Sequence, residues 1–265
     1  KMLSWLNKIS FRNGNTPLVN DSTCGIALSS EEIFNYAKIL NLKTHNLKLS
    51  DSGYRRWNDS YAEILIDVGQ IGPDYIPGHA HADTFNFEFH YKGKPIIVDT
   101  GISTYEKNSV RQLERSTESH NTIRLDGEDS SEVWGSFRVG RRAKITSFKE
   151  GKDIIVATHN GYKRIGALHT RKFRRLERKL IIEDIIESKS LHQIESFLHF
   201  HPNCNINVEK DIINIDSAIT IVFKNHRNLT IKEYDFSLGF NKTKKAFKIR
   251  TLAEKKSKIE ISYEN

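Results

Sequence analysis

The chain has 265 residues, 37% of them hydrophobic, and a formal net charge of +8. This length allows one large or two modest domains, and no apolar run reaches the roughly 18 residues that a membrane-spanning helix needs. The basic balance suits an anionic partner such as nucleic acid, an anionic lipid or an acidic glycan, but it is equally typical of a Lys-rich composition. Two cysteines, Cys24 and Cys204, make no metal-ligand set or disulfide framework, and they could pair once or stay as buried thiols.

The N-terminal part of the chain is predicted to be loop and helix. Residues 13–22 contain Asn-Gly, a proline and Asn-Asp-Ser, which are typical of a loop. Ser29 and Glu32 have the spacing of a capping box, and apolar residues follow at helical spacing. A helix is therefore predicted over residues 30–42.

After about residue 55 the pattern changes to short strands. Phe85, Phe87, Phe89 and Tyr91 alternate with polar residues, which is the period of a β-strand. Gly-containing turns separate several such segments, and many short strands at this spacing predict an all-β sandwich or barrel. The predicted strands cover 61–68, 85–91, 95–99, 121–125, 143–149, 153–158, 170–176, 179–187, 193–200, 206–209, 211–215, 218–223, 229–234, 246–252 and 257–263.

The densest polar cluster is Pro-Gly-His-Ala-His-Ala-Asp at residues 77–83. His79 and His81 are two residues apart, so in an extended segment both imidazoles point to one side, where they can bind a metal ion or a substrate. A β-fold could bring Asp99 and His120 beside His81, and two histidines with one carboxylate suit zinc. Taken singly, each piece is more often a surface histidine, a turn or a polar loop.

One geometric conflict arises in this segment. His79 and His81 share the odd parity of Phe85, Phe87 and Phe89. A single straight strand through 79–91 would therefore place imidazoles and phenyl rings on the same face. We expect a loop or bulge near residues 82–84 that separates the two groups.

The order of these pieces resembles the core of the heparinase II/III-like polysaccharide lyase family. After residues 78–83 come the strand at 85–91, then PIIVDTG at 95–101, then Tyr105, then ERSTESHNT at 114–122, with Asp-Gly and Trp-Gly pairs beyond. The resemblance is densest over about residues 75–140 and weaker over about 10–205.

The resemblance implies an α/α toroid followed by a large antiparallel β-sandwich of two sheets, with substrate in the cleft between them. Residues 1–50 would be the remnant of the toroid and a linker, and residues 51–265 would be the sandwich domain. Most of the toroid would be missing from this chain, and with it a catalytic tyrosine and an Asn-His pair.

The resemblance also implies β-elimination at a uronic acid in an acidic polysaccharide. A base removes the proton at C5 of the sugar, and the oxygen at C4 leaves. His79 would act at the substrate, and Tyr105 would contact the sugar or share in proton transfer. His81, Asp99 and His120 would hold a zinc ion that orders the site.

Arginines supply the expected substrate contacts, since a guanidinium pairs well with carboxylate or sulfate. Arg111 and Arg115 are preferred because they lie between the tyrosine and the last histidine of the motif. Arg138, Arg141 and Arg142 are further candidates, for which a solvated strand face is the alternative.

Two other functions remain open at this point: a non-catalytic carbohydrate-binding or structural module, and a zinc-dependent hydrolase that uses metal-bound water. No helix-turn-helix, zinc-finger or RNP pattern supports nucleic-acid binding. The expected partners are the acidic polysaccharide and the missing toroid of the same protein. The expected location is periplasmic or extracellular.

Overall fold

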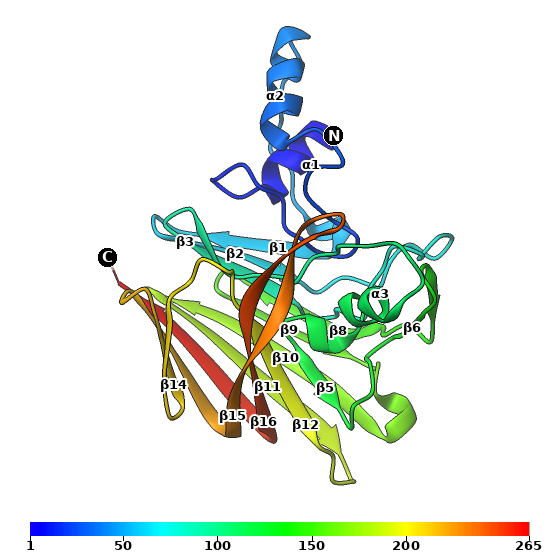
Figure 1. Cartoon of the computed structure of the whole chain (residues 1–265), viewed down its shortest axis with the longest axis vertical. Helices are drawn as coiled ribbons and strands as arrows, with labels where there is room; N and C mark the ends of the chain where they lie inside the picture. The colour runs from blue at the N-terminus through cyan, green and yellow to red at the C-terminus, as the bar shows by residue number, and fades with distance from the viewer. Residues whose placement is uncertain (265) are drawn as a thin grey trace.

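Two layers of antiparallel β-sheet lie beneath a helical arm in the computed structural model, which describes residues 1–264 (Figure 1). The smaller sheet has four strands in the order β1-β2-β3-β4. The larger sheet has ten strands: eight follow one another in the order β13-β14-β15-β16-β11-β10-β9-β8, and the other two branch from β16, which pairs with β12, which in turn pairs with β5. The predicted all-β sandwich with a short helical segment before it is confirmed.

The strands have the following bounds. The small sheet contains β1 (Tyr54–Asn58), β2 (Ala62–Asp67), β3 (Phe87–Tyr91) and β4 (Lys94–Ile97), and a separate hairpin contains β6 (Glu132–Trp134) and β7 (Arg138–Gly140). The large sheet contains β5 (Ile123–Leu125), β8 (Ile145–Gly151), β9 (Ile154–His159), β10 (Ala167–Leu176), β11 (Lys179–Ser188), β12 (Ile194–His199), β13 (Ile206–Glu209), β14 (Ile212–Ile215), β15 (Ile219–Gly239) and β16 (Lys242–Tyr263).

Three α-helices and three short 3-10 turns complete the described chain: α1 (Met2–Ile9), α2 (Ser30–Ile39), α3 (Ser109–Glu114), η1 (Ser50–Ser52), η2 (Thr117–Ser119) and η3 (Lys163–Ile165). Helix α2 begins where the capping box predicts, because Ser29 accepts from the backbone of Glu32 and the Glu32 carboxylate accepts from the backbone of Ser29. It ends three residues before the predicted bound, and Asn41 takes a positive φ of 53° just beyond it. No helix among residues 1–264 is long and apolar enough to cross a membrane.

The two sheets pack through a continuous apolar core. Phe87 and Phe89 of β3 are buried in one cluster with Phe173 of β10 and Ile261 of β16, and the rings of Phe87 and Phe173 lie 6.0 Å apart. Burying a side chain of this size contributes roughly 1.5–3 kcal/mol. This interface fixes the position of β3, whose preceding loop carries the two histidines of the polar cluster.

The linker between α1 and α2 covers the outer face of the small sheet. The ring of Phe11 stacks on His90 at 3.6 Å, and Glu63 accepts a hydrogen bond of 3.0 Å from the backbone of Arg12. Every residue of β2 and β3 is therefore buried, although the sheet is the outer layer of the sandwich. The linker is thereby held beside the residues that precede β3.

The expected break between the histidines and the phenylalanines is present. No strand covers residues 79–86, and β3 begins only at Phe87. Phe85 has a positive φ of 71°, which is unfavourable for an aromatic residue. This turn lets His81 and Phe87 face different surroundings.

Candidate functional site

Asp21, in the linker, meets both histidines of the polar cluster. The Nδ1 of His79 lies 2.8 Å from one carboxylate oxygen of Asp21, and the Nε2 of His81 lies 2.9 Å from the other. A carboxylate only accepts, so each of these ring nitrogens carries the hydrogen and donates it. The side chain of His79 is 64% exposed, whereas that of His81 is fully buried. Only His79 therefore presents a ring nitrogen, its Nε2, to a ligand from solvent.

Arg111 completes this arrangement around the same carboxylate. Its guanidinium donates to both oxygens of Asp21, one of them at 2.8 Å, and both side chains are buried. Burial raises the pKa of Asp21, but the hydrogen bonds from His81 and Arg111 outweigh it and lower the pKa to about 2. Asp21 is thus ionised at neutral pH and serves as the counter-ion of a buried arginine.

Asp99 and His120 form a second pair deeper in the fold. The Nδ1 of His120 donates to Asp99 at 2.8 Å, and Asn86 donates to the same oxygen at 2.6 Å. Burial lowers the pKa of His120, but the charge and hydrogen bond of Asp99 outweigh it and raise the pKa. The other nitrogen of His120, Nε2, is buried without a hydrogen-bond partner.

The three predicted metal ligands gather in one region, but they are not arranged around a single point. The rings of His81 and His120 lie 5.4 Å apart, while Asp99 is engaged by His120 and Asn86. Within residues 1–264, no three His, Cys, Asp or Glu side chains are placed to hold a metal ion as they stand.

The chemistry of the donors nevertheless fits a metal. His81 Nδ1 and His120 Nε2 are buried and unpaired, and leaving such groups unpaired is costly. Burial lowers the pKa of His81 to about 4, so its ring is neutral at pH 7 and Nδ1 offers a lone pair. The zinc site stays a prediction with two suitable, unused nitrogen donors.

The two arginines expected to bind substrate are buried. Arg111 and Arg115 are 0% and 1% exposed. Besides Asp21, Arg111 donates to the backbone carbonyl of Ser136, and Arg115 donates to the carbonyls of Ser136 at 3.0 Å and Ala80 at 2.9 Å. These guanidinium groups hold the β6–β7 hairpin and residues 77–83 together, and that of Arg111 also lies over the rings of Tyr105 and Phe137, at 5.0 and 5.4 Å from their centroids.

Tyr105 lies in the exposed part of the site, beside His79. The two ring centroids are 6.1 Å apart, and Tyr105 also contacts Phe137 at 5.1 Å and Phe240 at 4.8 Å. Burial and the charge of Asp21 raise the pKa of the Tyr105 hydroxyl, so it keeps its proton at neutral pH. A protonated hydroxyl and an imidazole nitrogen are thus available to the same ligand.

A buried polar network behind the site fixes the turn at Phe85. Arg171 forms a two-point ion pair with Asp184, at 2.7 and 2.8 Å, and donates to the carbonyls of Phe85 and Asn121. The side chain of Asn121 in turn donates to the carbonyls of Phe87 and Val98. The backbone on both sides of His120 and before β3 is therefore held by hydrogen bonds inside the sandwich.

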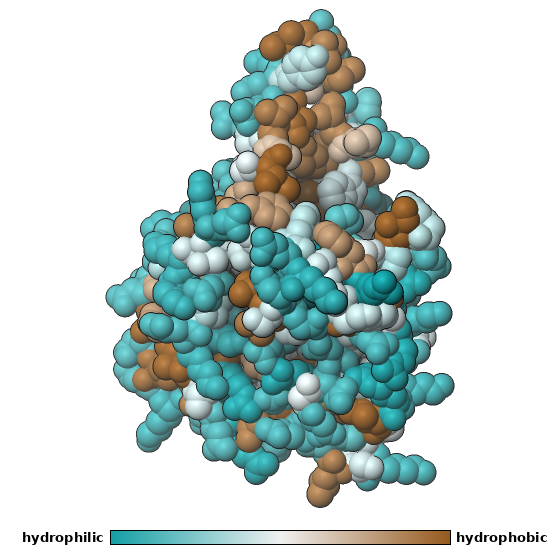
Figure 2. Space-filling model, turned by 45° about the vertical axis from the view of Figure 1, so that its right-hand side comes forward, coloured by the Kyte–Doolittle hydropathy of each residue, from teal (hydrophilic) through white to brown (hydrophobic). Residues whose placement is uncertain are grey.

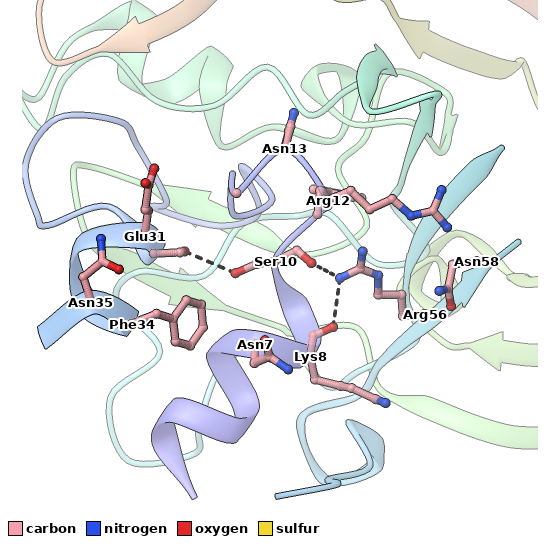
Figure 3. Close-up of a pocket in the computed structure, with 13 residues that line it drawn as sticks. Asn7, Lys8, Ser10, Arg12, Asn13, Glu31, Phe34, Asn35, Arg56 and Asn58 are labelled. Atoms are coloured by element: carbon pink, nitrogen blue, oxygen red, sulfur yellow. Dashed lines mark hydrogen bonds between the residues drawn. The ribbon is translucent and has the colours of Figure 1, made fainter. Parts of the chain in front are cut away.

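A separate hollow lies away from these residues, between α1, α2 and β1. Its lining includes Ser10, Phe34 and Arg56, and the Arg56 guanidinium donates to the carbonyls of Lys8 and Ser10 (Figure 3). None of the seven predicted site residues lines it. This hollow is therefore separate from the predicted site residues.

The family model described as heparinase II/III-like, C-terminal matches residues 42–264 of this chain. The chain belongs to this family. A search of curated proteins gives no match. Among solved structures, a heparan sulfate lyase HepC from Pedobacter heparinus is similar over 100% of this chain and 46% of its own, with 16% identity and a TM-score of 0.74. A structure of heparinase III is similar over 96% of this chain and 45% of its own, with 12% identity and a TM-score of 0.70.

At these identities the likeness establishes the heparinase-like fold of the chain, which spans less than half the length of either neighbour. The two cysteines left open by the sequence are both free, with Cys24 exposed and Cys204 half-buried. Asp21 is the site residue that the sequence did not single out. Its Asn-Asp-Ser setting is that of a loop, and only the proximity of its partners, 58 to 90 positions away, shows its role.

Proposed function

We propose that this chain is the C-terminal part of a polysaccharide lyase that cleaves a uronic-acid-containing polysaccharide by β-elimination. The observation that carries the proposal is the exposed imidazole of His79, with one nitrogen bound to an ionised carboxylate and Tyr105 beside it. Membership of a heparinase-like family supports the lyase class. The similar structures named as heparan sulfate lyases support an acidic polysaccharide as the substrate. The expected periplasmic or extracellular location belongs to the same proposal.

The elimination needs a base, an acid and a partner for the carboxylate of the uronate. The C5 proton goes to a base, the C4–C5 double bond forms, and the C4–oxygen bond breaks as that oxygen takes up a proton. His79 Nε2 is free to hydrogen-bond the uronate or to accept a proton, since Nδ1 is fixed by Asp21. The Tyr105 hydroxyl, whose raised pKa keeps it protonated, can donate to a sugar oxygen.

We further propose that His81 and His120, together with Asp99, hold a zinc ion. The ion would add positive charge beneath the cleft and order the histidine segment; elimination requires no metal-bound water. Elemental analysis of the purified chain and its melting temperature with and without a chelator test this proposal independently of activity. We expect the wild type to contain stoichiometric zinc and His120→Ala to lose it. A melting temperature that neither zinc nor chelator changes would contradict the zinc site.

The function is tested by the ultraviolet absorbance of the new C4–C5 double bond, with heparan sulfate and other uronate polymers and a longer protein that contains this chain. We expect His79→Ala to lower kcat/KM by about 100-fold or more, as for loss of a proton-transfer group. His192→Ala, at a histidine between β11 and β12, is the control. New reducing ends without absorbance would indicate a hydrolase, and binding without either signal would indicate a carbohydrate-binding module.

A further inference from the structure

The β6–β7 hairpin, which adjoins His79, presents an aromatic ring and a cation to solvent. Phe137, in the turn between the two strands, is 43% exposed. Arg138 follows it, is exposed, and has no hydrogen-bond or ion-pair partner for its side chain within residues 1–264. An exposed aromatic ring and an unpaired guanidinium on consecutive residues are suited to a ligand that offers apolar faces and negative charges.

The hairpin lies directly against the proposed catalytic residues. The Phe137 ring is 5.5 Å from the His79 ring and 5.1 Å from the Tyr105 ring, as measured between centroids. A Cβ atom added to Gly78 would lie 3.1 Å from the carbonyl oxygen of Phe137, so the histidine segment and the turn are in close contact. A sugar bound at His79 would therefore be within reach of Phe137.

Buried side chains hold this turn in place from below. The Ser136 carbonyl accepts hydrogen bonds from Arg111 at 3.1 and 3.0 Å and from Arg115 at 3.0 Å. Gln112 donates to the carbonyl of Val133 at 2.8 Å. Because the turn is ordered before a ligand arrives, binding to it loses less conformational entropy than binding to a free loop.

We infer that the β6–β7 hairpin is a sugar-binding subsite, in which Phe137 stacks on the apolar face of a pyranose ring and Arg138 pairs with a carboxylate or sulfate of the same bound saccharide chain. This inference rests on the proposed acidic polysaccharide substrate. It assigns Arg111 and Arg115 to support of the subsite and gives the contact with the anion to Arg138. Trp134 is equally exposed, but the ring contacts with His79 and Tyr105 are made by Phe137, which is therefore the platform nearer the proposed catalytic residues.

Isothermal titration of residues 1–265 with a sulfated tetrasaccharide prepared from heparan sulfate tests the subsite. We expect Phe137→Ala to weaken binding about tenfold and Phe137→Trp to retain it. Arg138→Gln is expected to weaken binding about fivefold or more and to reduce its dependence on salt. Phe247→Ala is the matched control, because Phe247 is also 43% exposed but lies on β16. Arg227→Gln, at an exposed position of β15, is the control for charge. Circular dichroism and melting temperature establish that each variant is folded.

Equal affinities of the wild type, Phe137→Ala and Arg138→Gln would overturn the subsite, and so would an absence of binding by the wild type. A loss in Phe247→Ala as large as that in Phe137→Ala would overturn it as well, because it would show unspecific apolar contact. Elimination assays on a longer protein separate this inference from the proposed function. Cleavage that is indifferent to Phe137→Ala removes the subsite only, whereas binding that depends on Phe137 without any elimination removes the lyase proposal only.

Discussion

At the scale of single residues, Asp21 joins the linker between α1 and α2 to the sandwich through three side chains. Its carboxylate is bound by His79, His81 and Arg111, which come from two other segments of the chain. The arginine has no other ionised partner among the described residues, and a buried cation without a counter-ion is strongly destabilising. Asp21 therefore has a role in stability that can be separated from any role in catalysis.

The substitution Asp21→Asn keeps the size of the side chain and removes its charge. We expect it to lower the free energy of unfolding by about 3 kcal/mol, because Arg111 stays buried without a counter-ion. Urea denaturation measures the change. Asp126→Asn is the matched control: Asp126 also accepts from a histidine, His192, at 2.6 Å, but its side chain is 39% exposed. That pair should contribute about 1 kcal/mol or less, and equal losses in the two variants would contradict the role given to Asp21.

A second residue-scale prediction concerns acid stability. Burial in β3 lowers the pKa of His90 to about 3, whereas an unfolded histidine titrates near 6.5. Between these two pKa values the imidazole of His90 is protonated in the unfolded chain but neutral in the folded chain. The contribution of His90 to stability is therefore lost as the pH falls from about 6.5 towards 3. His90→Gln should therefore flatten the pH dependence of the urea midpoint between pH 6.5 and 4.5. An equally steep dependence in the variant would assign the effect to other groups.

At the scale of elements, hydrophobic alternation predicts most strands to within a few residues, because the strands of the large sheet bury one face and expose the other. Two gaps predicted inside the long strands were wrong, because β15 continues through residues 224–228 and β16 continues through residues 253–256. Asn225 and Asn228 are residues typical of a turn between two strands. In the structure they take positive φ values of 60° and 54° at irregularities in the pairing of β15, which continues through them. Strands β6 and β7 have only three residues each, too few for a period to be recognised.

In the site, too, contacts between residues close in sequence could be predicted, whereas contacts between distant residues could not. Spacing alone indicates that His79 and His81 act together, since their relation is local. The partners of Arg111 and Arg115 are carbonyl groups and a linker carboxylate, which sequence patterns do not reveal. Substrate binding by these arginines stays a prediction, and nothing in the sequence indicated that their guanidinium groups have buried partners within the fold.

A buried ion pair joins β10 to β11. Arg171 and Asp184 face each other in register and are buried, so Arg171→Leu leaves a buried carboxylate without its cation. We expect a loss of about 3–5 kcal/mol in the free energy of unfolding by urea. The next pair in the same register, Lys172 and Glu183, is the control, because these side chains are 31% and 18% exposed. Lys172→Leu should cost about 1 kcal/mol or less, and a comparable loss would refute the special role of the buried pair.

At the scale of the whole molecule, the helical arm exposes apolar side chains that the sandwich does not cover. Ile39 is 75% exposed, Leu28 is 63% exposed and Tyr36 is 61% exposed. Figure 2 shows apolar surface gathered on this arm, above the largely polar surface of the sandwich. Contiguous apolar surface of this kind marks a contact with another domain or chain. The resemblance to lyases with an α/α toroid makes the toroid of a longer protein the proposed cover.

The last prediction follows from this division of the molecule. His79 and Tyr105 provide two polar groups at the exposed side of the sandwich, and the proposed elimination calls for further groups that transfer the protons at C5 and at the C4 oxygen and bind the uronate carboxylate. By resemblance, these are a tyrosine and an Asn-His pair of the toroid. We therefore expect residues 1–265 alone to produce no measurable C4–C5 double bond from heparan sulfate or alginate. A longer protein that includes the toroid should do so, with a rate at least about 1000-fold higher, since misplaced or absent proton-transfer groups cost orders of magnitude. Both proteins are compared in the same absorbance assay at equal molar concentration, after circular dichroism has shown that the shorter one is folded. Comparable rates would show that the sandwich contains a complete site, and the base would then have to be sought among His79, Tyr105 and their neighbours.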